Sequence, residues 1–293
     1  MDRSELLEKI GALPPVAGLL TEDFLAGDFG SILKGQGIEF DEVRRYERGD
    51  DVRSIDRNVS ARFGTPYVKM YREEREMTIL LLLDGSSSMF AVAGGKNGVN
   101  RYEQALIAGA LIAFSAERAG QRLGALVFGP GIIRLLPPRK GKTQSMAFIN
   151  AALEPESRRR GSGLGAALTG ADRLLKRRSL IVVISDFLCV DWEQEFQKLS
   201  RRHDVIALCI RDPLDRELPP GGLVIMEDPE TGDRLYAPTG FSRFRSAWAE
   251  WKEERARLWE SICRRSGAAP LELSTDEDAS AVLLRFFSER RRR

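Results

Sequence analysis

The stretch Met77-Thr78-Ile79-Leu80-Leu81-Leu82-Leu83-Asp84-Gly85-Ser86-Ser87-Ser88 joins a continuous apolar run to a polar loop. An apolar run of this length without alternation predicts a β-strand buried on both faces, as in parallel sheets covered by helices. A second such run, Leu180–Ser185, leads into Asp186. Because strands of this kind alternate with helical patterns through residues 77–210, we predict an α/β fold with a doubly wound, mostly parallel sheet flanked by helices.

The same alternation continues toward the C-terminus. We predict strands at 79–83, 123–128, 132–136, 180–185, 204–210 and 271–273, and helices at 102–116, 143–153, 164–178, 191–202, 241–265 and 277–288. The turn-rich segment 227–233 lies between two short apolar runs, which predicts a β-hairpin at 222–236. We therefore expect one α/β domain over 77–293 that includes the hairpin and the long helix.

The long helix at 241–265 carries a stripe of large side chains at steps of three and four residues. Its members are Phe241, Phe244, Trp248, Trp251, Arg255, Leu258 and Ile262. Such a stripe is typical of a helix packed on its own domain, which is the interpretation that we prefer. An exposed helix that docks a partner is the alternative.

Residues 1–76 have a different pattern and form a predicted lead-in domain. A short helical pattern at 4–29 is broken at Pro14-Pro15, and an irregular β-rich segment follows. Gly49-Asp50-Asp51 supplies a turn in this segment, and residues 66–71 are typical of a strand.

Composition restricts the class of protein. Hydrophobic residues make up 43% of the 293 residues, which excludes a disordered chain. The net charge is +2, although residues 77–210 hold 18 basic against 11 acidic side chains, enough to attract an acidic partner but too few for a nucleic-acid binder.

Three cysteines are too few for a disulfide framework or a cysteine-based zinc site. No apolar run is long enough for a transmembrane segment and the start lacks signal-peptide features, so we expect a cytoplasmic protein.

Polar side chains follow both buried strands. Asp84, Ser86 and Ser88 form an Asp-x-Ser-x-Ser pattern after the first strand, and Asp186 follows the second. Between them, the glycine-rich loop 160–165 contributes Ser162. Parallel sheets bind ligands beyond the carboxyl ends of their strands, and carboxylate and hydroxyl oxygens suit Mg²⁺ or Mn²⁺. The pattern predicts a metal site there; the alternative is that Asp84 and Ser86 only cap the next helix.

This arrangement resembles the metal-ion-dependent adhesion site of von Willebrand factor type A domains. The resemblance implies a type A-like fold and one bound ion, Mg²⁺ or else Mn²⁺ or Ca²⁺. The ligands that it implies are Asp84, Ser86, Ser88, Ser162 and Asp186. The chain departs from the family at Ser162, where threonine is usual, and at Gly163, where relatives often have aspartate.

The lead-in carries a second resemblance. The segments 37–40, 44–46, 49–56 and 60–62 resemble the signature of the domain of unknown function fifty-eight family, apart from Arg57, where tryptophan is usual. The resemblance implies a type A-like domain and an association with MoxR-type AAA+ ATPases. The charged residues of the signature are expected to form a structural network of ion pairs, with a docking surface for the ATPase as the alternative; they are Arg44, Asp50, Asp51, Arg53 and Asp56.

The predicted ligand set favours binding over catalysis. Two carboxylates and three neutral hydroxyl groups leave a divalent ion electron-poor, with a position open for another anionic oxygen. We therefore expect a non-enzymatic interaction module that binds an acidic residue of a client or partner, as an adaptor beside a MoxR-type ATPase. The alternative is a metal-dependent phosphohydrolase that uses Asp84, although Ser86 stands where such enzymes need a second aspartate. His203 is expected at the surface or at a strand edge.

Overall fold

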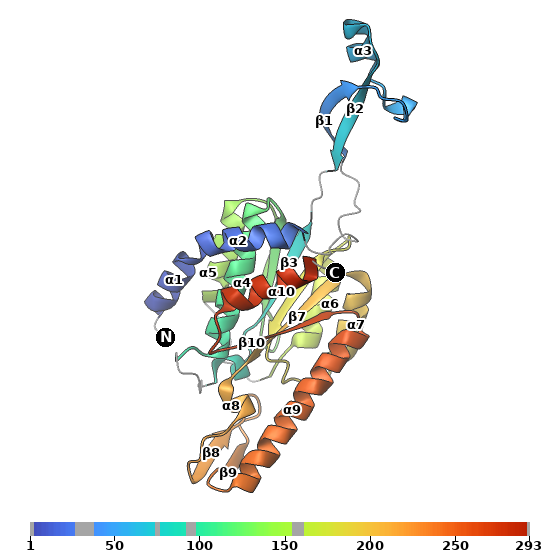
Figure 1. Ribbon diagram of the computed structural model, residues 1–293. Helices are drawn as coiled ribbons and strands as arrows, with labels where there is room; N and C mark the ends of the chain where they lie inside the picture. Colours follow the sequence, from blue (N-terminus) through green and yellow to red (C-terminus); the bar gives the residue numbers. More distant parts are fainter. Residues whose placement is uncertain (1–2, 27–37, 74–76, 92–97, 154–160, 292–293) are drawn as a thin grey trace. The chain divides into compact units, whose positions relative to one another are not determined.

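The structure is a computed structural model, which describes residues 3–26, 38–73, 77–91, 98–153 and 161–291 (Figure 1). The chain divides into two compact units. Residues 1–32 and 77–293 form the first, which we call the sheet unit, and residues 33–76 form the second, the lead-in unit. Each unit is described by itself below.

A six-stranded sheet is the centre of the sheet unit, with strand order β10-β7-β6-β3-β4-β5. The strands are β3 (Thr78–Asp84), β4 (Arg122–Phe128), β5 (Ile132–Arg139), β6 (Leu180–Ser185), β7 (Asp204–Arg211) and β10 (Ala269–Ser274). Neighbouring strands are parallel except β4 and β5, which are antiparallel. This confirms the mostly parallel sheet that the apolar runs predict.

Helices surround this sheet. They are α1 (Arg3–Gly11), α2 (Leu13–Ala26), α4 (Arg101–Arg118), α5 (Lys142–Leu153), α6 (Leu164–Leu174), α7 (Glu193–Arg202), α8 (Pro213–Arg216), α9 (Ser242–Arg265) and α10 (Ala279–Arg291), with a 3₁₀ turn, η2, at Ser87–Phe90. Those between residues 101 and 202 and after 241 lie close to the predicted positions, whereas α8 was not predicted. The predicted hairpin is present as β8 (Leu223–Glu227) paired with β9 (Arg234–Pro238). Within the described part of the chain, no helix has the length and apolar character that a bilayer crossing requires.

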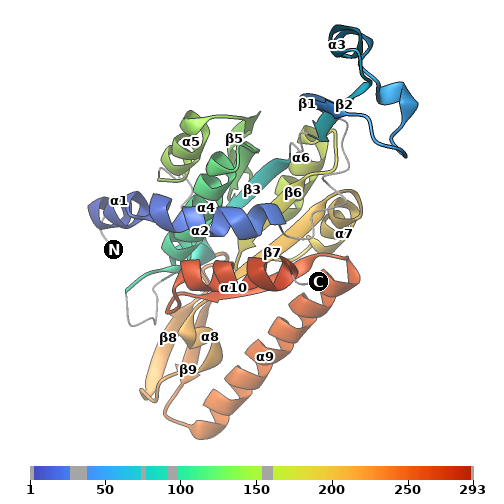
Figure 2. The same cartoon turned by 45° about the horizontal axis from the view of Figure 1, so that its top comes forward.

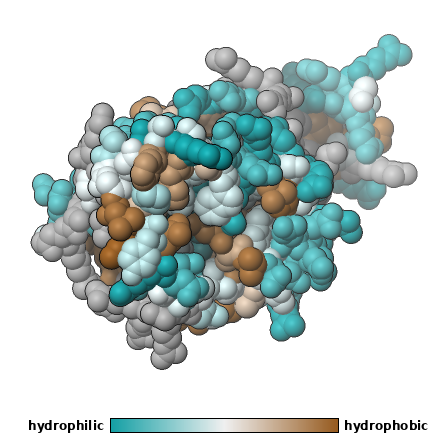
Figure 3. Space-filling model, turned by 90° about the horizontal axis from the view of Figure 1, so that it is seen from below, coloured by the Kyte–Doolittle hydropathy of each residue, from teal (hydrophilic) through white to brown (hydrophobic). Residues whose placement is uncertain are grey.

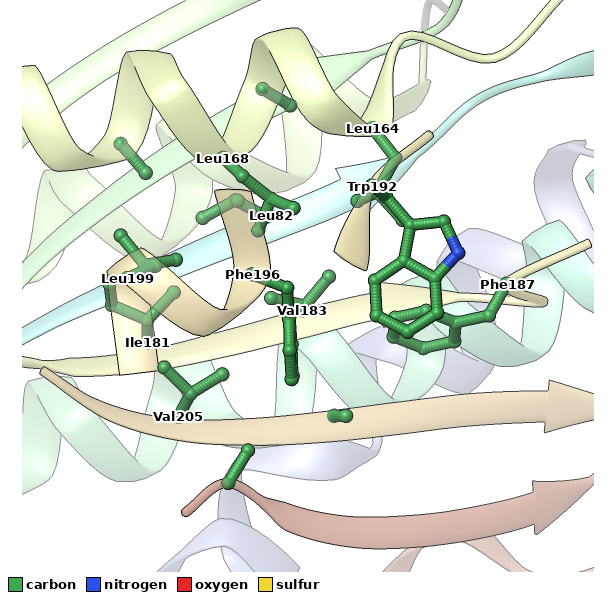
Figure 4. Packing of buried hydrophobic residues seen from close by; sticks show 14 of the residues in the cluster. Leu82, Leu164, Leu168, Ile181, Val183, Phe187, Trp192, Phe196, Leu199 and Val205 are labelled. Carbon is green, nitrogen blue, oxygen red and sulfur yellow. The ribbon is translucent and has the colours of Figure 1, made fainter. Parts of the chain in front are cut away.

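One face of the sheet is covered by α6, α7 and the end of α9. Side chains from these helices pack with Leu82, Val183 and other inward-facing strand residues into one buried cluster (Figure 4). Phe187 and Trp192, from the segment after β6, fill the end of this cluster nearest the carboxyl ends of the strands, with ring centroids 5.2 Å apart. Burial of this apolar surface fixes the loop that follows β6.

The opposite face is covered by α4, with α5 beside it and α10 against β10. Asn100 begins α4 with a capping box, in which its side chain accepts a hydrogen bond from Glu103 N and the Glu103 side chain accepts one from Asn100 N. Almost the whole circumference of α4 is buried, because α2 and α10 pack on its outer side (Figure 2).

The two N-terminal helices belong to the sheet unit, whereas the sequence assigned them to the lead-in. Ala17 of α2 is fully buried, and its carbonyl oxygen accepts a hydrogen bond from Ser115 Oγ at 3.2 Å. Pro14 and Pro15 lie in the first turn of α2, where a missing N–H costs nothing. The prolines therefore begin a helix, and the structure places the lead-in unit at 33–76.

The lead-in unit contains the antiparallel pair β1 (Ile38–Arg45) and β2 (Tyr67–Glu73), a 3₁₀ turn η1 (Val52–Ser54) and α3 (Arg57–Phe63). Asp56 caps α3 by accepting hydrogen bonds from Asn58 N and Val59 N. Arg44 donates to Asp50 at 2.6 Å, which is one ion pair of the expected network. Gly37 of the signature, and the side chain of Arg53, lie outside the described residues.

Both edges of the sheet contain proline. Pro137 and Pro138 lie in β5, and Pro270 lies in β10. Because proline has no N–H, these strands cannot form a complete ladder on their outer side.

The stripe on α9 is buried only at its C-terminal end. Phe241, Trp251 and Leu258 are 71%, 46% and 54% exposed, whereas Trp259 and Ile262 are buried. The prediction that this helix packs on its own domain is confirmed only in part. Trp248 is half-buried and its Nε1 donates to Leu214 O of α8 at 3.1 Å, whereas the start of α9 extends past the sheet beside the hairpin (Figure 1). Figure 3 looks onto this end of the molecule, where exposed apolar side chains lie among hydrophilic ones.

His203 lies at the start of a strand, as one of the two predicted alternatives has it, but it is buried and not at the surface. Only 2% of the residue is exposed, and its Nε2 lies 3.6 Å from Asp172 Oδ1. The residue immediately precedes β7, an inner strand between β6 and β10, so the packing around the start of that strand covers the ring.

Candidate metal centre

The two predicted carboxylates lie at the same edge of the sheet. Strands β3 and β6 are parallel neighbours, with Leu83 opposite Ile184. Asp84 and Ser185 therefore lie level with each other, and Asp186 follows one residue further along. The carboxyl ends of both strands thus bring the two polar loops together, as the sequence predicts.

Asp84 is held by two hydrogen bonds in a buried position. Its Oδ1 accepts from Ser86 N at 2.8 Å, and its Oδ2 accepts from Ser185 Oγ at 2.6 Å. Only 1% of the residue is exposed. The first bond closes the tight loop after β3, and the second fastens this loop to β6.

A chain of contacts leads from Asp84 to Asp186. The hydroxyl oxygens of Ser86 and Ser88 are 3.2 Å apart, and the Ser88 hydroxyl group lies near enough to Asp186 to lower the pKa of its carboxyl group. Asp186 Oδ1 accepts from Leu188 N at 3.0 Å, while its buried Oδ2 has no hydrogen-bond partner among the described residues. Four of the five predicted ligands, Asp84, Ser86, Ser88 and Asp186, therefore lie together at this edge of the sheet.

The fifth predicted ligand, Ser162, lies in a tight loop before α6. Gly161 has a φ of +99°, and Gly163 N donates to Gly129 O at 2.5 Å. The Ser162 hydroxyl oxygen is buried and, within the described ranges, has no hydrogen-bond partner. Its proximity to the site is indicated by Cys189, whose thiol interacts with Ser162 and with the charges of Asp84 and Asp186.

Negative charge is concentrated in this buried site. Burial, together with the charge of Asp186, raises the pKa of Asp84 to about 7. Burial also raises the pKa of Asp186, although the positive charge of Arg101 opposes this shift. Two buried carboxylates in one place are costly without a positive charge beside them.

Sequence reasoning missed two residues at this site. Arg101, at the start of α4, donates to the Ser88 carbonyl oxygen at 3.3 Å. Glu230, in the β8–β9 turn, accepts from Ser88 N at 3.0 Å and from Gly161 N at 2.5 Å. Both residues come from segments distant in sequence, and no local pattern marks either of them.

The side chains fit a hard divalent cation. The unpartnered oxygens, Asp186 Oδ2 and Ser162 Oγ, are the ligand types that Mg²⁺, Mn²⁺ and Ca²⁺ prefer. No cluster of three or more His, Cys, Asp or Glu side chains suited to a metal occurs in the described part of the chain. A site here would therefore combine two carboxylates with neutral hydroxyl groups, and an ion bound by so few charged ligands remains strongly electrophilic.

Comparison with known proteins places the chain among relatives that are themselves uncharacterized. The family described as "Protein of unknown function DUF58" matches residues 42–257. An uncharacterized protein of Mycobacterium tuberculosis, Rv1480, is 33% identical over 274 residues, which cover 92% of this chain and 84% of that protein. An uncharacterized protein of Mycobacterium avium, MAV169, is 37% identical over 133 residues, covering 44% of this chain and 76% of that protein.

Solved structures with a similar fold include an aerotolerance-related membrane protein from Bacteroides fragilis. That structure has a TM-score of 0.50 and 18% sequence identity, and the match covers 73% of this chain and 99% of that chain. The conserved hypothetical protein BatB from Bacteroides thetaiotaomicron has a TM-score of 0.47 and 17% identity, covering 73% of this chain and 96% of that chain. At this level of identity, the first likeness extends to the fold alone.

Proposed function

The chain belongs to the DUF58 family of proteins of unknown function, and from this premise we propose that it is a non-enzymatic protein-interaction module. Its fold is of the von Willebrand factor type A kind, with a metal-ion-dependent adhesion site at the carboxyl ends of β3 and β6. The observation that carries the proposal is that Asp84, Ser86, Ser88 and Asp186 lie together at one edge of the sheet, and that the buried Oδ2 of Asp186 has no hydrogen-bond partner among the described residues.

The ion would be held by Asp84, Ser86, Ser88, Ser162 and Asp186. When bound, Mg²⁺, or Mn²⁺ or Ca²⁺ in its place, supplies an electrophilic position for one further anionic oxygen. The residues of the chain orient these ligands: Ser185 fixes the carboxylate of Asp84, and Leu188 N fixes that of Asp186. An aspartate or glutamate of a partner protein is the group that suits the open position.

Two features favour binding over hydrolysis by Asp84. Its carboxylate is almost fully buried, which restricts the access of a substrate to it. The only histidine of the sequence, His203, precedes the start of β7, whereas the candidate site lies at the carboxyl ends of the strands. The candidate site therefore has no histidine that could act as a general base.

We further propose that the partner is a MoxR-type AAA+ ATPase or an acidic client protein. In the second case, this protein and the ATPase would act together on the client in its assembly or maturation. The lead-in signature supports this proposal by its resemblance to ATPase-associated proteins. The excess of basic residues over 77–210 supports it electrostatically, because such a surface attracts acidic proteins. Capture of the ATPase or client should require a divalent ion, be lost on adding EDTA, and be lost in Asp84→Ala.

Thermal unfolding with and without Mn²⁺ tests the metal site directly. Saturating Mn²⁺ should raise the Tm of the wild type by about 5 °C or more, because a ligand that binds only the folded state stabilises it. In EDTA, Asp186→Asn should be more stable than the wild type, since it removes one of two neighbouring buried charges, and Mn²⁺ should not stabilise it further. Asp172→Asn, which changes a half-buried acid on α6 that pairs with Arg202, is the control and should respond to Mn²⁺ as the wild type does.

The rival phosphohydrolase is tested with a panel of phosphate esters in Mg²⁺ and Mn²⁺. We expect no turnover above that of Asp84→Ala. Turnover that Asp84→Ala abolishes would replace the binding function with an enzymatic one, and a wild type without any Mn²⁺ response would remove the ion from the mechanism.

A further inference from the structure

The turn of the β8–β9 hairpin holds the backbone of one acidic residue in a fixed position. Asp228 Oδ1 accepts from Glu230 N at 2.8 Å, and Gly232 N donates to Asp228 O at 2.7 Å. Thr231 Oγ1 and Asp233 Oδ2 are 2.9 Å apart. Because the turn is closed by its own side chains, the carboxylate of Glu230 is not needed to complete it.

That carboxylate instead reaches the two loops that carry the candidate ligands. One oxygen accepts from Ser88 N and the other from Gly161 N, across 142 and 69 residues of sequence. The Ser88 hydroxyl group also lies near Asp186, and Gly161 directly precedes Ser162. Glu230 therefore joins the loop after β3 to the loop before α6 at the candidate metal centre.

A third acidic side chain at these loops adds to the negative charge of the candidate centre. Asp84 and Asp186 already place two acids there. Arg101, the described cation that contacts the loop after β3, also donates to Asp215 at 2.8 Å, so its charge is shared with another carboxylate. Two backbone amides hold Glu230 in this acidic environment, and a divalent ion would offset the combined negative charge.

We propose that Glu230 is an intramolecular ligand of the candidate metal centre. It takes the place that the proposed function gives to the acidic residue of a partner, so a partner binds only when the hairpin turn leaves the site. This inference rests on the proposed function and adds its regulation. The hairpin acts as a built-in competitor, because an acidic side chain tied to the same chain has a high effective concentration at the site.

A purely mechanical role is the competing explanation, in which Glu230 only fastens the hairpin to the body of the sheet unit. The two roles differ in their effect on the coordination of the metal ion. Loss of a fastening changes the hairpin alone, whereas loss of a ligand opens a coordination position to water and to small carboxylates.

Water-proton relaxation of the Mn²⁺-loaded full chain separates these roles. Glu230→Ala should gain one exchangeable water on Mn²⁺ relative to the wild type, and adding acetate should remove this gain. The wild type should not respond to acetate. Glu227→Ala is the matched control, because Glu227 lies in the same hairpin but pairs with Arg234 at 3.0 Å; it should behave as the wild type does.

Glu230→Gln provides a second variant that keeps an oxygen acceptor for the two amides. It should bind Mn²⁺ roughly tenfold more weakly than the wild type, the size of effect expected when an anionic group near a metal is replaced. Equal hydration and an equal acetate response in the wild type and Glu230→Ala would overturn the inference, while the proposed function stands if Asp84→Ala still abolishes Mn²⁺ binding. Failure of the wild type to bind Mn²⁺ would overturn both.

Discussion

The glycine at position 163 leaves room for two loops to meet at the candidate metal centre. A Cβ atom built there would lie 2.7 Å from Pro130 O and 2.8 Å from Gly129 O, closer than real Cβ contacts occur. Gly163 N also donates to Gly129 O. A larger residue would therefore move either this turn or the neighbouring Ser162. This close packing explains why position 163 has no side chain that could bind the metal ion.

We predict that Gly163→Ala destabilises the protein and weakens metal binding. Overpacking against backbone atoms costs about 1–3 kcal/mol in the free energy of unfolding. Chemical denaturation should report this loss, and Mn²⁺ titration should show weaker binding through the displaced Ser162. Gly131→Ala is the control, because a Cβ atom there meets nothing within 4 Å and its backbone is not in the left-handed region. Equal stabilities of the two variants would contradict the prediction.

The buried ring of His203 makes stability depend on pH. Burial lowers its pKa from the ordinary value of 6.5; Arg202 and Arg178 act in the same direction, and Asp172 opposes them. In the unfolded chain the ring takes up a proton near pH 6.5, whereas in the folded chain it stays neutral to lower pH. The unfolded state therefore binds more protons below pH 6.5, and the free energy of unfolding falls as the pH falls.

We predict that His203→Gln loses less stability than the wild type between pH 7 and pH 5. Urea denaturation at several pH values measures the difference in slope, which isolates the histidine because all other groups are common to both proteins. Parallel curves for the two proteins would show that the ring is not held neutral.

Among the elements, α8 and α9 are joined to α4 by one buried cluster of charges. Asp215 of α8 accepts from Arg101 at 2.8 Å and from Lys252 of α9 at 2.7 Å, and all three side chains are about one-tenth exposed. Burial alone would raise the pKa of Asp215, but the two cations hold it well below the ordinary value. The cluster fixes the middle of α9 at Lys252 and, through Arg101, the loop that carries Ser88.

We predict that Asp215→Asn lowers the free energy of unfolding by about 3 kcal/mol or more, because it leaves two buried cations without their carboxylate. Denaturant titration measures the loss. Glu253→Gln, which breaks the exposed pair with Arg257 on the same helix, is the control and should be indistinguishable from the wild type. A loss of similar size in both variants would contradict the role of burial.

How far the elements could be predicted follows from the kind of signal that each one carries. The runs at β3 and β6 are largely apolar, so the sequence predicts both as buried strands. In contrast, α3 lacks an apolar stripe, and the sequence analysis did not predict a helix there. The five candidate ligands follow strands or a glycine-rich loop, and local sequence could place them. Glu230 comes from a hairpin whose docking depends on tertiary packing, and the burial of His203 and the exposure of Phe241 depend on packing in the same way.

At the scale of the whole molecule, the two units differ in the depth of their cores. β3, β6 and β7 are almost completely buried, whereas Val68 is the one buried side chain in the lead-in unit among those whose exposure is described. A two-stranded sheet with so little apolar burial has low stability by itself.

We predict that backbone amides of residues 38–73 exchange with deuterium much faster than those of β3, β6 and β7. Opening of the lead-in unit needs little free energy, whereas the inner strands exchange only when the sheet unit unfolds. Mass spectrometry of peptic fragments measures both rates in one sample. Comparable protection in the two units would show that the lead-in is stabilised by more than its own side chains.

The prolines in β5 and β10 limit how copies of this protein can meet. With Pro137, Pro138 and Pro270 on the two outermost strands, N–H donors are missing on both edges of the sheet, which weakens any ladder that a neighbouring chain could add. Growth of a shared sheet into fibres is thereby discouraged even when the protein is concentrated, which favours assembly through helices, loops or the hairpin.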